Sequence, residues 1–278
     1  LADLTGADVA ASVDDTGAIT LGGDWDLEYS TGIVESTPLF GSTSDYSFLL
    51  EVINGTDDDD TISGNADQGD LITGGQGDDT YKFQDNWGSD TVVEAIGEGV
   101  DTLDFSDVTT DLTFTIDAGG TVSVTDGTNT ITTVANIEKL IGGSGNNTLK
   151  GPGADTVWNL TGDNSGIVNG LIFSNIDDLE GSADFNDTFS VENKVKWSGT
   201  IDGGAGTGTN TLNLTSVTEN VIFSIEQSGT ISVNTAPDTW SSLGIIPEEV
   251  LSLLSDGLGI DDVQNVSSLI GGSADNTF

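Results

Sequence analysis

Residues 74–82 read Gly74-Gly75-Gln76-Gly77-Asp78-Asp79-Thr80-Tyr81-Lys82, a nine-residue unit of the form G-G-x-G-x-D-x-(apolar)-x. Its glycines allow left-handed backbone dihedrals, so the turn can direct several carbonyl groups inward. The aspartate adds the negative charge that a hard cation such as Ca²⁺ requires. The apolar residue two positions later begins a short strand packed inside the coil. The unit therefore predicts a calcium-binding turn followed by a buried strand.

Weaker forms of the same unit lie on both sides of residues 74–82. Aligned on the aspartate, they cover residues 55–63 (Asp60), 65–73 (Asp70) and 85–93 (Asp90), and a fifth closes at Asp101. Two such units make one turn of a stacked β-coil, so loops two units apart lie above one another. We therefore expect loop 55–60 to stack on loop 74–79, loop 65–70 to stack on loop 85–90, and calcium to lie between each pair.

The candidate metal ligands are the carboxylates of these turns and the glycines whose carbonyl groups would face the ion. They are Gly55, Asp57, Asp58, Asp60, Asp67, Asp70, Gly75, Gly77, Asp79, Gly88, Asp90, Asp101 and Asp187. Asp187 belongs to the ring of residues 181–187, for which the sequence leaves the presence of an ion open. At Asn147 and Asn276 asparagine replaces the aspartate, so such turns are closed either by amide hydrogen bonds or by weaker calcium sites.

A tripeptide of Asp or Asn, then Thr, then a bulky apolar residue extends the pattern along the chain. It occurs at residues 60–62, 79–81, 90–92, 101–103, 129–131, 147–149, 155–157, 187–189, 210–212 and 276–278. A polar residue followed by a short strand with an inward apolar side chain is typical of stacked repeats. The sequence predicts an all-β fold.

A longer repeat predicts hairpins that leave this coil. Residues 111–124 are similar to residues 220–233 and to residues 8–21, with Gly17, Gly120 and Gly229 at the same point. Around Gly120 the apolar residues alternate with polar ones, which indicates two half-buried strands joined by a tight turn. A related segment at residues 175–181 is expected to have no hairpin.

These patterns divide the chain into four parts. Residues 1–54 form a first hairpin module with an insertion, residues 55–103 the calcium-binding coil, residues 104–200 a second hairpin module with further coil turns, and residues 201–278 a third hairpin module. The last part also contains the helix that we expect near 247–256, because Pro247 suits a first helical position and Gly257 a helix end.

The composition narrows the range of functions. The chain has 47 Asp plus Glu against five Lys plus Arg, and its formal net charge is -42. Such a surface repels phosphate backbones and anionic lipids, so we expect no nucleic-acid partner and no membrane insertion. Divalent cations between turn carboxylates would relieve the repulsion. Solubility alone, as in salt-adapted proteins, is the alternative explanation of the acidity.

The missing residue types exclude several kinds of chemistry. With no Cys and no His, zinc, copper and haem have no thiolate or imidazole ligand, and oxygen-ligand metals remain. With no Arg either, catalytic triads and arginine clamps are unavailable. Carboxylate pairs remain, but 47 acidic residues produce close pairs by chance. We therefore expect a non-catalytic protein.

The unit at 74–82 and its variants from residue 55 onward resemble the hemolysin-type repeats of the repeats-in-toxin family. The wider pattern, including residues 136–147 and 158–166, looks like the extended modules of large bacterial surface and adhesin-like proteins. The resemblance implies a parallel β-roll, or β-solenoid, with hairpin excursions, export by a type I system, and calcium-triggered folding outside the cell. It also implies that Asp60, Asp70, Asp79, Asp90, Gly75 and Gly77 supply ligands to Ca²⁺.

Two functions follow as expectations. In the first, the chain is a calcium-stabilised structural segment of a secreted surface layer, fibre or adhesin, and its partners are copies of itself or other surface proteins. In the second, the chain binds or processes an acidic polysaccharide at the cell surface, with calcium bridging anionic groups of both molecules.

Overall fold

The structure is a computed structural model. It describes residues 10–11, 29–30, 51–66, 69–219, 221–225, 231–235, 259–273 and 276–277. Every regular element in these residues is a β-strand, which confirms the all-β prediction. The helix expected near 247–256 lies outside the described residues. So does most of the hairpin expected at 8–21, where β1 (Ala10–Ala11) pairs with β2 (Tyr29–Ser30).

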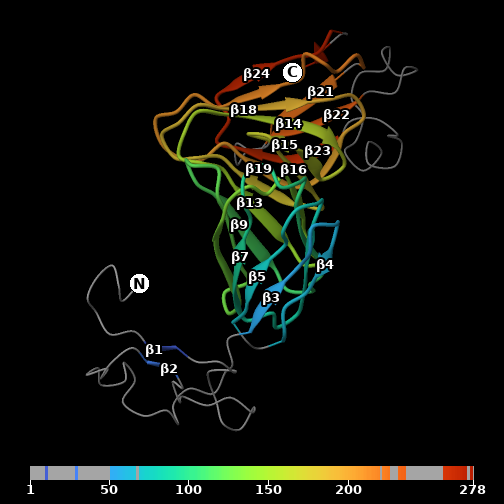
Figure 1. Cartoon of the computed structure of the whole chain (residues 1–278). Coiled ribbons are helices and arrows are strands. Elements are labelled where there is room, and N and C mark those ends of the chain that lie inside the picture. Colours follow the sequence, from blue (N-terminus) through green and yellow to red (C-terminus); the bar gives the residue numbers. More distant parts are fainter. Residues whose placement is uncertain are drawn as a thin grey trace.

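Two large, mostly parallel sheets contain nearly all of the described strands (Figure 1). The first has thirteen strands in the order β25-β21-β22-β23-β19-β17-β13-β9-β10-β11-β7-β5-β3. Their bounds are β3 (Val52–Asn54), β5 (Leu71–Thr73), β7 (Ser89–Val93), β9 (Leu112–Ile116), β10 (Val122–Thr125), β11 (Thr130–Val134), β13 (Asn147–Lys150), β17 (Asp178–Glu180), β19 (Lys196–Asp202), β21 (Val221–Ile225), β22 (Ile231–Thr235), β23 (Gly259–Gln264) and β25 (Asn276–Thr277).

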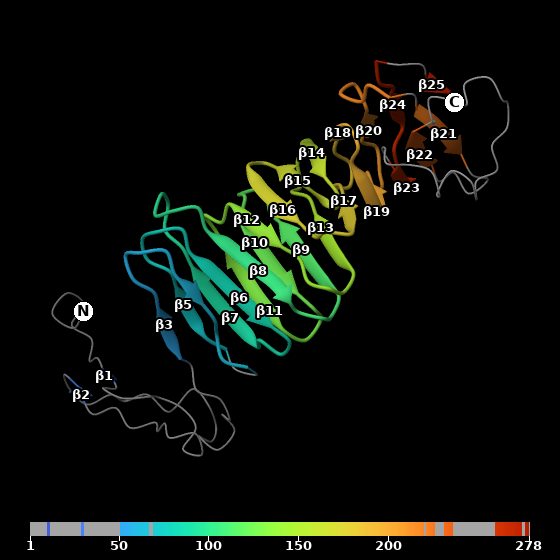
Figure 2. The same cartoon turned by 90° about the vertical axis from the view of Figure 1, so that its right-hand side faces the viewer.

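The second sheet has ten strands in the order β24-β20-β18-β14-β15-β16-β12-β8-β6-β4. Their bounds are β4 (Thr61–Ile62), β6 (Thr80–Gln84), β8 (Thr102–Asp107), β12 (Lys139–Ile141), β14 (Thr156–Gly162), β15 (Ser165–Val168), β16 (Leu171–Ser174), β18 (Asp187–Val191), β20 (Thr211–Asn213) and β24 (Ser268–Ile270). Figure 2 shows the two sheets facing each other along the molecule.

From β3 to β8 the chain alternates between the two sheets, and each strand pairs in parallel with the strand two elements later. Thr61 in β4 pairs with Thr80 in β6, and Leu71 in β5 pairs with Thr91 in β7. The backbone continues this register into the turns, because the Thr80 N–H donates to the Asp60 carbonyl at 2.8 Å. Loop 55–60 therefore lies against loop 74–79, and loop 65–70 against loop 85–90, as the repeat spacing predicted.

Antiparallel three-strand meanders interrupt this alternation. The hairpins predicted at 111–124 and 220–233 are present as β9–β10 and β21–β22, each extended by a third strand. A further meander, β14–β15–β16, was not predicted, and it directly precedes residues 175–181, for which we expected no hairpin. The signal was available: Asn169 and Gly170 form a two-residue turn with φ of 48° and 89°, and Asn-Gly is the preferred sequence for such turns.

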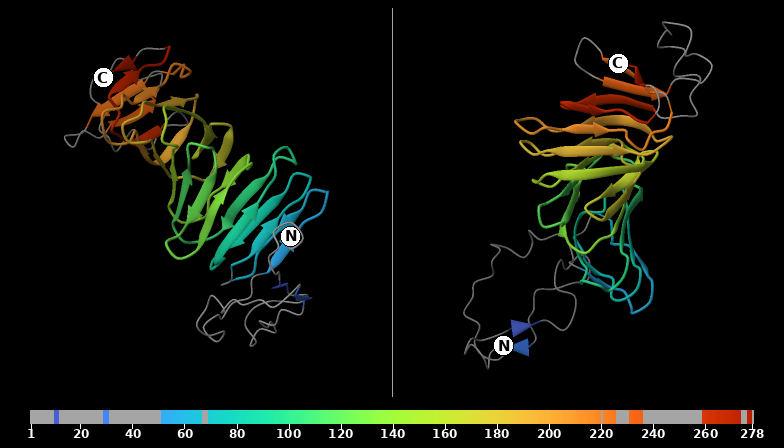
Figure 3. Two further views of the ribbon diagram at one scale, coloured as in Figure 1. Left: turned by 60° about the vertical axis from the view of Figure 1, so that its left-hand side comes forward. Right: turned by 90° about the horizontal axis from the view of Figure 1, so that it is seen from above.

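Each meander makes one sheet wider than the other. Neighbouring strands lie about 4.8 Å apart, so two extra strands add roughly 10 Å to one side of the stack. The first meander, β9–β10–β11, is in the thirteen-stranded sheet, and the second, β14–β15–β16, is in the ten-stranded sheet. The wider side of the stack therefore changes from one sheet to the other. Strands β5, β7 and β9 run nearly vertically in Figure 1, whereas β14 and β18 run nearly horizontally. Figure 3 shows the same change of direction from two other sides.

Large side chains fill the space between the sheets. Phe83 stacks on Phe105 with ring centroids 4.7 Å apart, and Trp87 packs edge-on against Phe105. Further along, Trp158 stacks on Phe189 at 5.6 Å. All of these side chains are buried. The core is therefore continuous from the glycine-rich turns into the meanders, and it fixes the strands that carry the turn carboxylates.

No helix in the described part of the chain is long and apolar enough to cross a membrane.

Candidate cation site

Three aspartates at the ends of stacked turns are linked through the backbone. The Asp60 N–H donates to Asp79 Oδ1 at 2.8 Å, and the Asp79 N–H donates to Asp101 Oδ1 at 2.9 Å. The Asp101 N–H donates in turn to Glu138 Oε2 at 2.9 Å. We name these four residues the carboxylate column. One oxygen of each acceptor carboxylate holds the preceding turn in register, which leaves the second oxygen for another partner.

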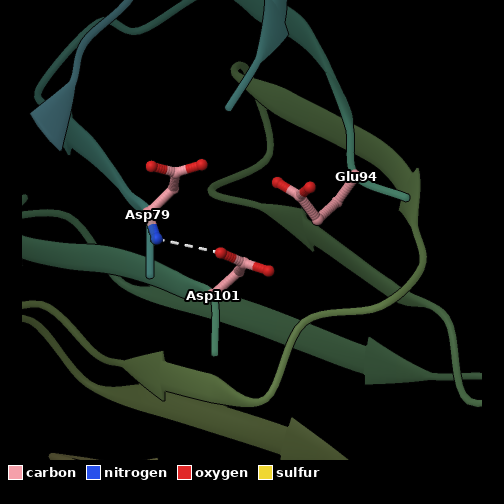
Figure 4. Close-up of side chains that lie close together, drawn as sticks. All are labelled: Asp79, Glu94 and Asp101. Carbon is pink, nitrogen blue, oxygen red and sulfur yellow. Dashed lines mark hydrogen bonds between the residues drawn. The ribbon is translucent and has the colours of Figure 1, made fainter. Parts of the chain in front are cut away.

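Asp79 has no partner for its second oxygen. Its side chain is 0% exposed, and Oδ2 is buried without a hydrogen bond in the described residues. Glu94 and Asp101 lie beside it, and one oxygen from each of the three side chains lies within 4.8 Å of the other two (Figure 4). The described residues place no Lys in contact with the group, since their ion pairs are Lys82–Asp107 and Lys150–Glu180. This group could hold a metal ion.

Glu94 is the residue of this group that the sequence analysis missed. It follows β7 at the point where Gly74 follows β5 and Gly55 follows β3. A Cβ on Gly74 would lie 2.2 Å from Asp79 Oδ2, so glycine is needed there to leave room for the carboxylate. At residue 94 the chain instead places a third carboxylate inside the stack. An acidic residue at a position that otherwise carries glycine was the signal that could have identified it.

Asp79, Glu94 and Asp101 bring carboxylates together without a cationic side chain of the described residues beside them. Burial raises the pKa of Glu94, and burial together with the charge of Glu138 raises the pKa of Asp101. The Tyr81 hydroxyl donates to Glu94 Oε2. Burial and this hydrogen bond raise the pKa of Tyr81, so the phenol stays protonated. A bound cation or added protons would stabilise this cluster.

A second pair of carboxylates lies on the opposite side of the stack. The Asp70 N–H donates to Asp90 Oδ1 at 2.9 Å, while Asp70 Oδ1 and Asp90 Oδ2 are buried without hydrogen bonds. A Cβ on Gly64 would lie 2.9 Å from one carboxylate and 3.1 Å from the other, so the two groups adjoin the same glycine. Burial, with a further contribution from the charge of Asp70, raises the pKa of Asp90 to about 7.

Asp187 repeats this geometry in the ring at 181–187. The Ser182 N–H donates to Asp187 Oδ2 at 2.8 Å, and Oδ1 is buried without a hydrogen bond. Burial raises the pKa of Asp187. The Trp158 N–H lies close enough to oppose that shift, but it does not complete a hydrogen bond of normal geometry. Asp187 therefore has one buried carboxylate oxygen without a hydrogen bond, as Asp70 and Asp79 do.

The structure places the other predicted ligands that it describes away from the buried carboxylates. Gly75 and Gly77 both have φ of 110°, and they lie against residues 56 and 58 of the neighbouring turn, where a side chain would clash. Asp57 and Asp58 are exposed and are not brought into the buried clusters, and Gly88 donates its N–H to Asn129 Oδ1 at 2.9 Å rather than facing a carboxylate. Asp67 lies outside the described residues.

In the asparagine turns, hydrogen bonds of the amide satisfy the position that aspartate occupies in the other turns. Asn147 accepts from the Gly143 N–H through Oδ1 at 3.1 Å, as Asp187 accepts from Ser182. Its Nδ2 then donates to the carbonyls of Gly143 at 2.9 Å and Gly145 at 2.8 Å. Asn210 Nδ2 likewise donates to the Asn265 carbonyl at 3.0 Å. An aspartate places an oxygen where asparagine places this donor, so it repels carbonyls that the amide would bind.

Comparison with known proteins gives little further information. A family model described as "Domain of unknown function (DUF4347)" matches residues 1–50. No curated protein matches the chain. Because the family match ends before the turn that begins at Gly55, it does not test the resemblance of the glycine-rich turns to hemolysin-type repeats.

In the metal-free protein we expect the melting temperature to fall as the pH rises from 5 to 8. The pKa of Asp90 is about 7 in the folded state, whereas an unfolded aspartate has a pKa of about 3.9. A raised folded-state pKa contributes stability that is fully present below about 3.9 and is lost as the pH passes through about 7. Calorimetry in excess chelator would measure the effect.

The matched variant is Asp90→Asn, which cannot titrate at this position. Its melting temperature in chelator should depend less on pH than that of the parent protein over the same range. General charge repulsion also decreases on acidification, so the difference between the two proteins isolates Asp90. Identical pH profiles would contradict the assignment.

Proposed function

We propose that this chain is a calcium-stabilised parallel β-roll, a β-solenoid whose turns hold cations. It acts as a non-catalytic structural part of a bacterial surface layer, fibre or adhesin outside the cell. The observation that carries the proposal is the buried Asp79 carboxylate, whose Oδ2 has no partner beside Glu94 and Asp101. Carboxylate and backbone carbonyl oxygens are the ligands that Ca²⁺ prefers.

The choice of calcium rests on the ligand types and on the shape of the turns. Mg²⁺ requires a small octahedral shell and keeps several of its waters, whereas Ca²⁺ accepts six to eight oxygens in irregular arrangements. Turns such as 74–79 offer carbonyls and carboxylates without octahedral symmetry, and the chain has no His or Cys to attract softer metals. Extracellular calcium sites typically have dissociation constants of about 10⁻⁴ to 10⁻³ M, and we expect the sites of this chain to bind in that range.

The asparagine turns divide the stack into parts that need the ion to different degrees. Each calcium present at a hundredfold above its dissociation constant adds about 2.7 kcal/mol to folding. Turns 55–60, 65–70 and 74–79 end in aspartate and would depend on that contribution. The turn at Asn147 is closed by its own amide. Removal of calcium should therefore loosen the first part of the chain before the second.

Amide hydrogen exchange in the presence of a chelator would test this. We expect protection to be lost over residues 55–103 and retained over 112–174, because only the first segment has aspartates with unsatisfied oxygens in successive turns. Added Ca²⁺ should restore the protection and Mg²⁺ should not. Equal loss in both segments, or no loss in either, would count against the proposal.

Asp79→Asn should turn a cation-dependent turn into one closed by an amide. We expect the variant to bind one calcium ion fewer in a calorimetric titration and to melt at a higher temperature than the parent protein in chelator. Asp104→Asn is the matched control, since it removes the same charge from the outer face of β8, where Asp104 Oδ1 accepts from the Ser106 N–H. If the Asp79 variant bound as many ions as the control, Asp79 would not be a ligand.

The proposed partner is another copy of the chain, or another surface protein, once cations have reduced the net charge of -42. Analytical ultracentrifugation should show larger species in millimolar Ca²⁺ than in chelator. A chain that remained monomeric at all concentrations in calcium, yet was retained by an immobilised alginate column, would favour binding of an acidic polysaccharide over self-assembly.

A further inference from the structure

The described residues contain a cavity of about 220 Å³ whose lining includes none of the aspartates of the candidate cation sites. It is lined by the turn between β9 and β10, the turn between β15 and β16, and residues 137 and 138 between β11 and β12. Two meanders from opposite sheets therefore meet at this point. One water occupies about 30 Å³, so the cavity has room for roughly seven waters, which is less than a drug-sized ligand needs.

One wall of the cavity is aliphatic, and its rim is polar and exposed. Ile116, Ile137, Val168 and Leu171 line it, and each is at most 9% exposed. Gly120, Asn169 and Gly170 are exposed at the rim, where both turns end. The cavity therefore offers an aliphatic wall beside polar groups, and it can be reached from solvent.

Glu138 places a partly exposed negative charge beside these aliphatic side chains. Its Oε2 accepts the Asp101 N–H at 2.9 Å, so the side chain is held in place by the carboxylate column. No described residue forms an ion pair with it, and its other oxygen has no hydrogen-bond partner within the described part of the chain. A carboxylate that lies beside four aliphatic side chains without a counter-charge is well matched to a cation with a short apolar body.

We propose that this cavity binds a small aliphatic ammonium group, such as that of an alkylamine or a lysine side chain. The ammonium group pairs with the Glu138 carboxylate, and the hydrocarbon chain packs against Ile116, Ile137, Val168 and Leu171. A metal ion fits the cavity poorly, because Ca²⁺ requires six or more oxygen ligands and the wall provides one carboxylate among aliphatic groups.

Chain length separates this site from general attraction of cations to an acidic protein. Ethyl-, propyl- and butylammonium carry the same charge but bury successively more apolar surface. We expect the affinity to rise about twofold for each added CH₂ up to butylammonium, because the open cavity buries only part of each methylene and complete burial would correspond to about fourfold. Non-specific attraction to a surface of this charge would not depend on chain length and would be reduced by salt.

The experiment is a titration of the full chain with the three amines in about 0.5 M salt, followed by calorimetry and by saturation-transfer NMR of the butyl methyl group. Glu138→Gln should lower the affinity for butylammonium about tenfold or more, because the charge pairing is lost while an oxygen remains to accept the Asp101 N–H. Glu192→Gln, which removes a charge from an exposed turn, should leave the affinity unchanged. Circular dichroism of both variants checks that they fold.

Affinities that were equal across the three amines would overturn the proposal, and so would equal binding by the Glu138 and Glu192 variants. Butanol, which has the same apolar body without the charge, should bind at least tenfold more weakly than butylammonium. The titration is repeated in calcium and in chelator. The lining residues lie between 116 and 171, within the segment that we expect to stay folded without metal, whereas Asp101, whose N–H holds Glu138, lies in the segment that we expect to loosen. The dependence on amine chain length measured in calcium therefore tests the cavity, and a lower affinity in chelator would report the loss of the Asp101 contact.

Discussion

The arrangement of this molecule depends on one hydrogen bond repeated from turn to turn, in which the backbone N–H of one aspartate donates to the carboxylate of the aspartate in the next circuit. Asp60, Asp79, Asp101 and Glu138 are connected in this way. The bond fixes the register of the parallel strands that follow. It also draws Asp79 and Asp101 inside the stack, where Asp79 leaves an oxygen buried without a hydrogen bond. Order in the turns and the proposed binding of cations therefore have the same origin.

In the asparagine turns an amide group takes the position that the aspartate carboxylate takes elsewhere. Asn147 keeps the oxygen that accepts the turn N–H and replaces the other oxygen with a donor for two glycine carbonyls. One chain thus combines turns that leave a carboxylate oxygen unpaired with turns that are closed by an amide. The meanders add a second difference along the stack, because they widen one sheet and then the other. They also bring together the turns that enclose the cavity beside Glu138.

Much of the fold could be predicted from local pattern. The spacing of Asp60, Asp70, Asp79 and Asp90 was enough to predict which loops stack, because a fixed repeat length fixes the neighbour in a regular stack. Period-two alternation around Gly120 predicted β9–β10. The meander at β14–β16 was missed because Asn169-Gly170, a strong turn signal, was not weighed against the coil pattern around it.

The sequence by itself determined the chemistry of the turns: oxygen ligands only, a large negative charge, and glycines where the backbone must take positive φ or approach a neighbour. The tertiary structure decided which of those carboxylates meet. Asp57 and Asp58 have the same chemistry as Asp79, but they are exposed, while Glu94 comes from another turn to lie beside Asp79 and Asp101. Local sequence cannot specify such a meeting, because it depends on how the circuits stack and on which side of the chain the core covers.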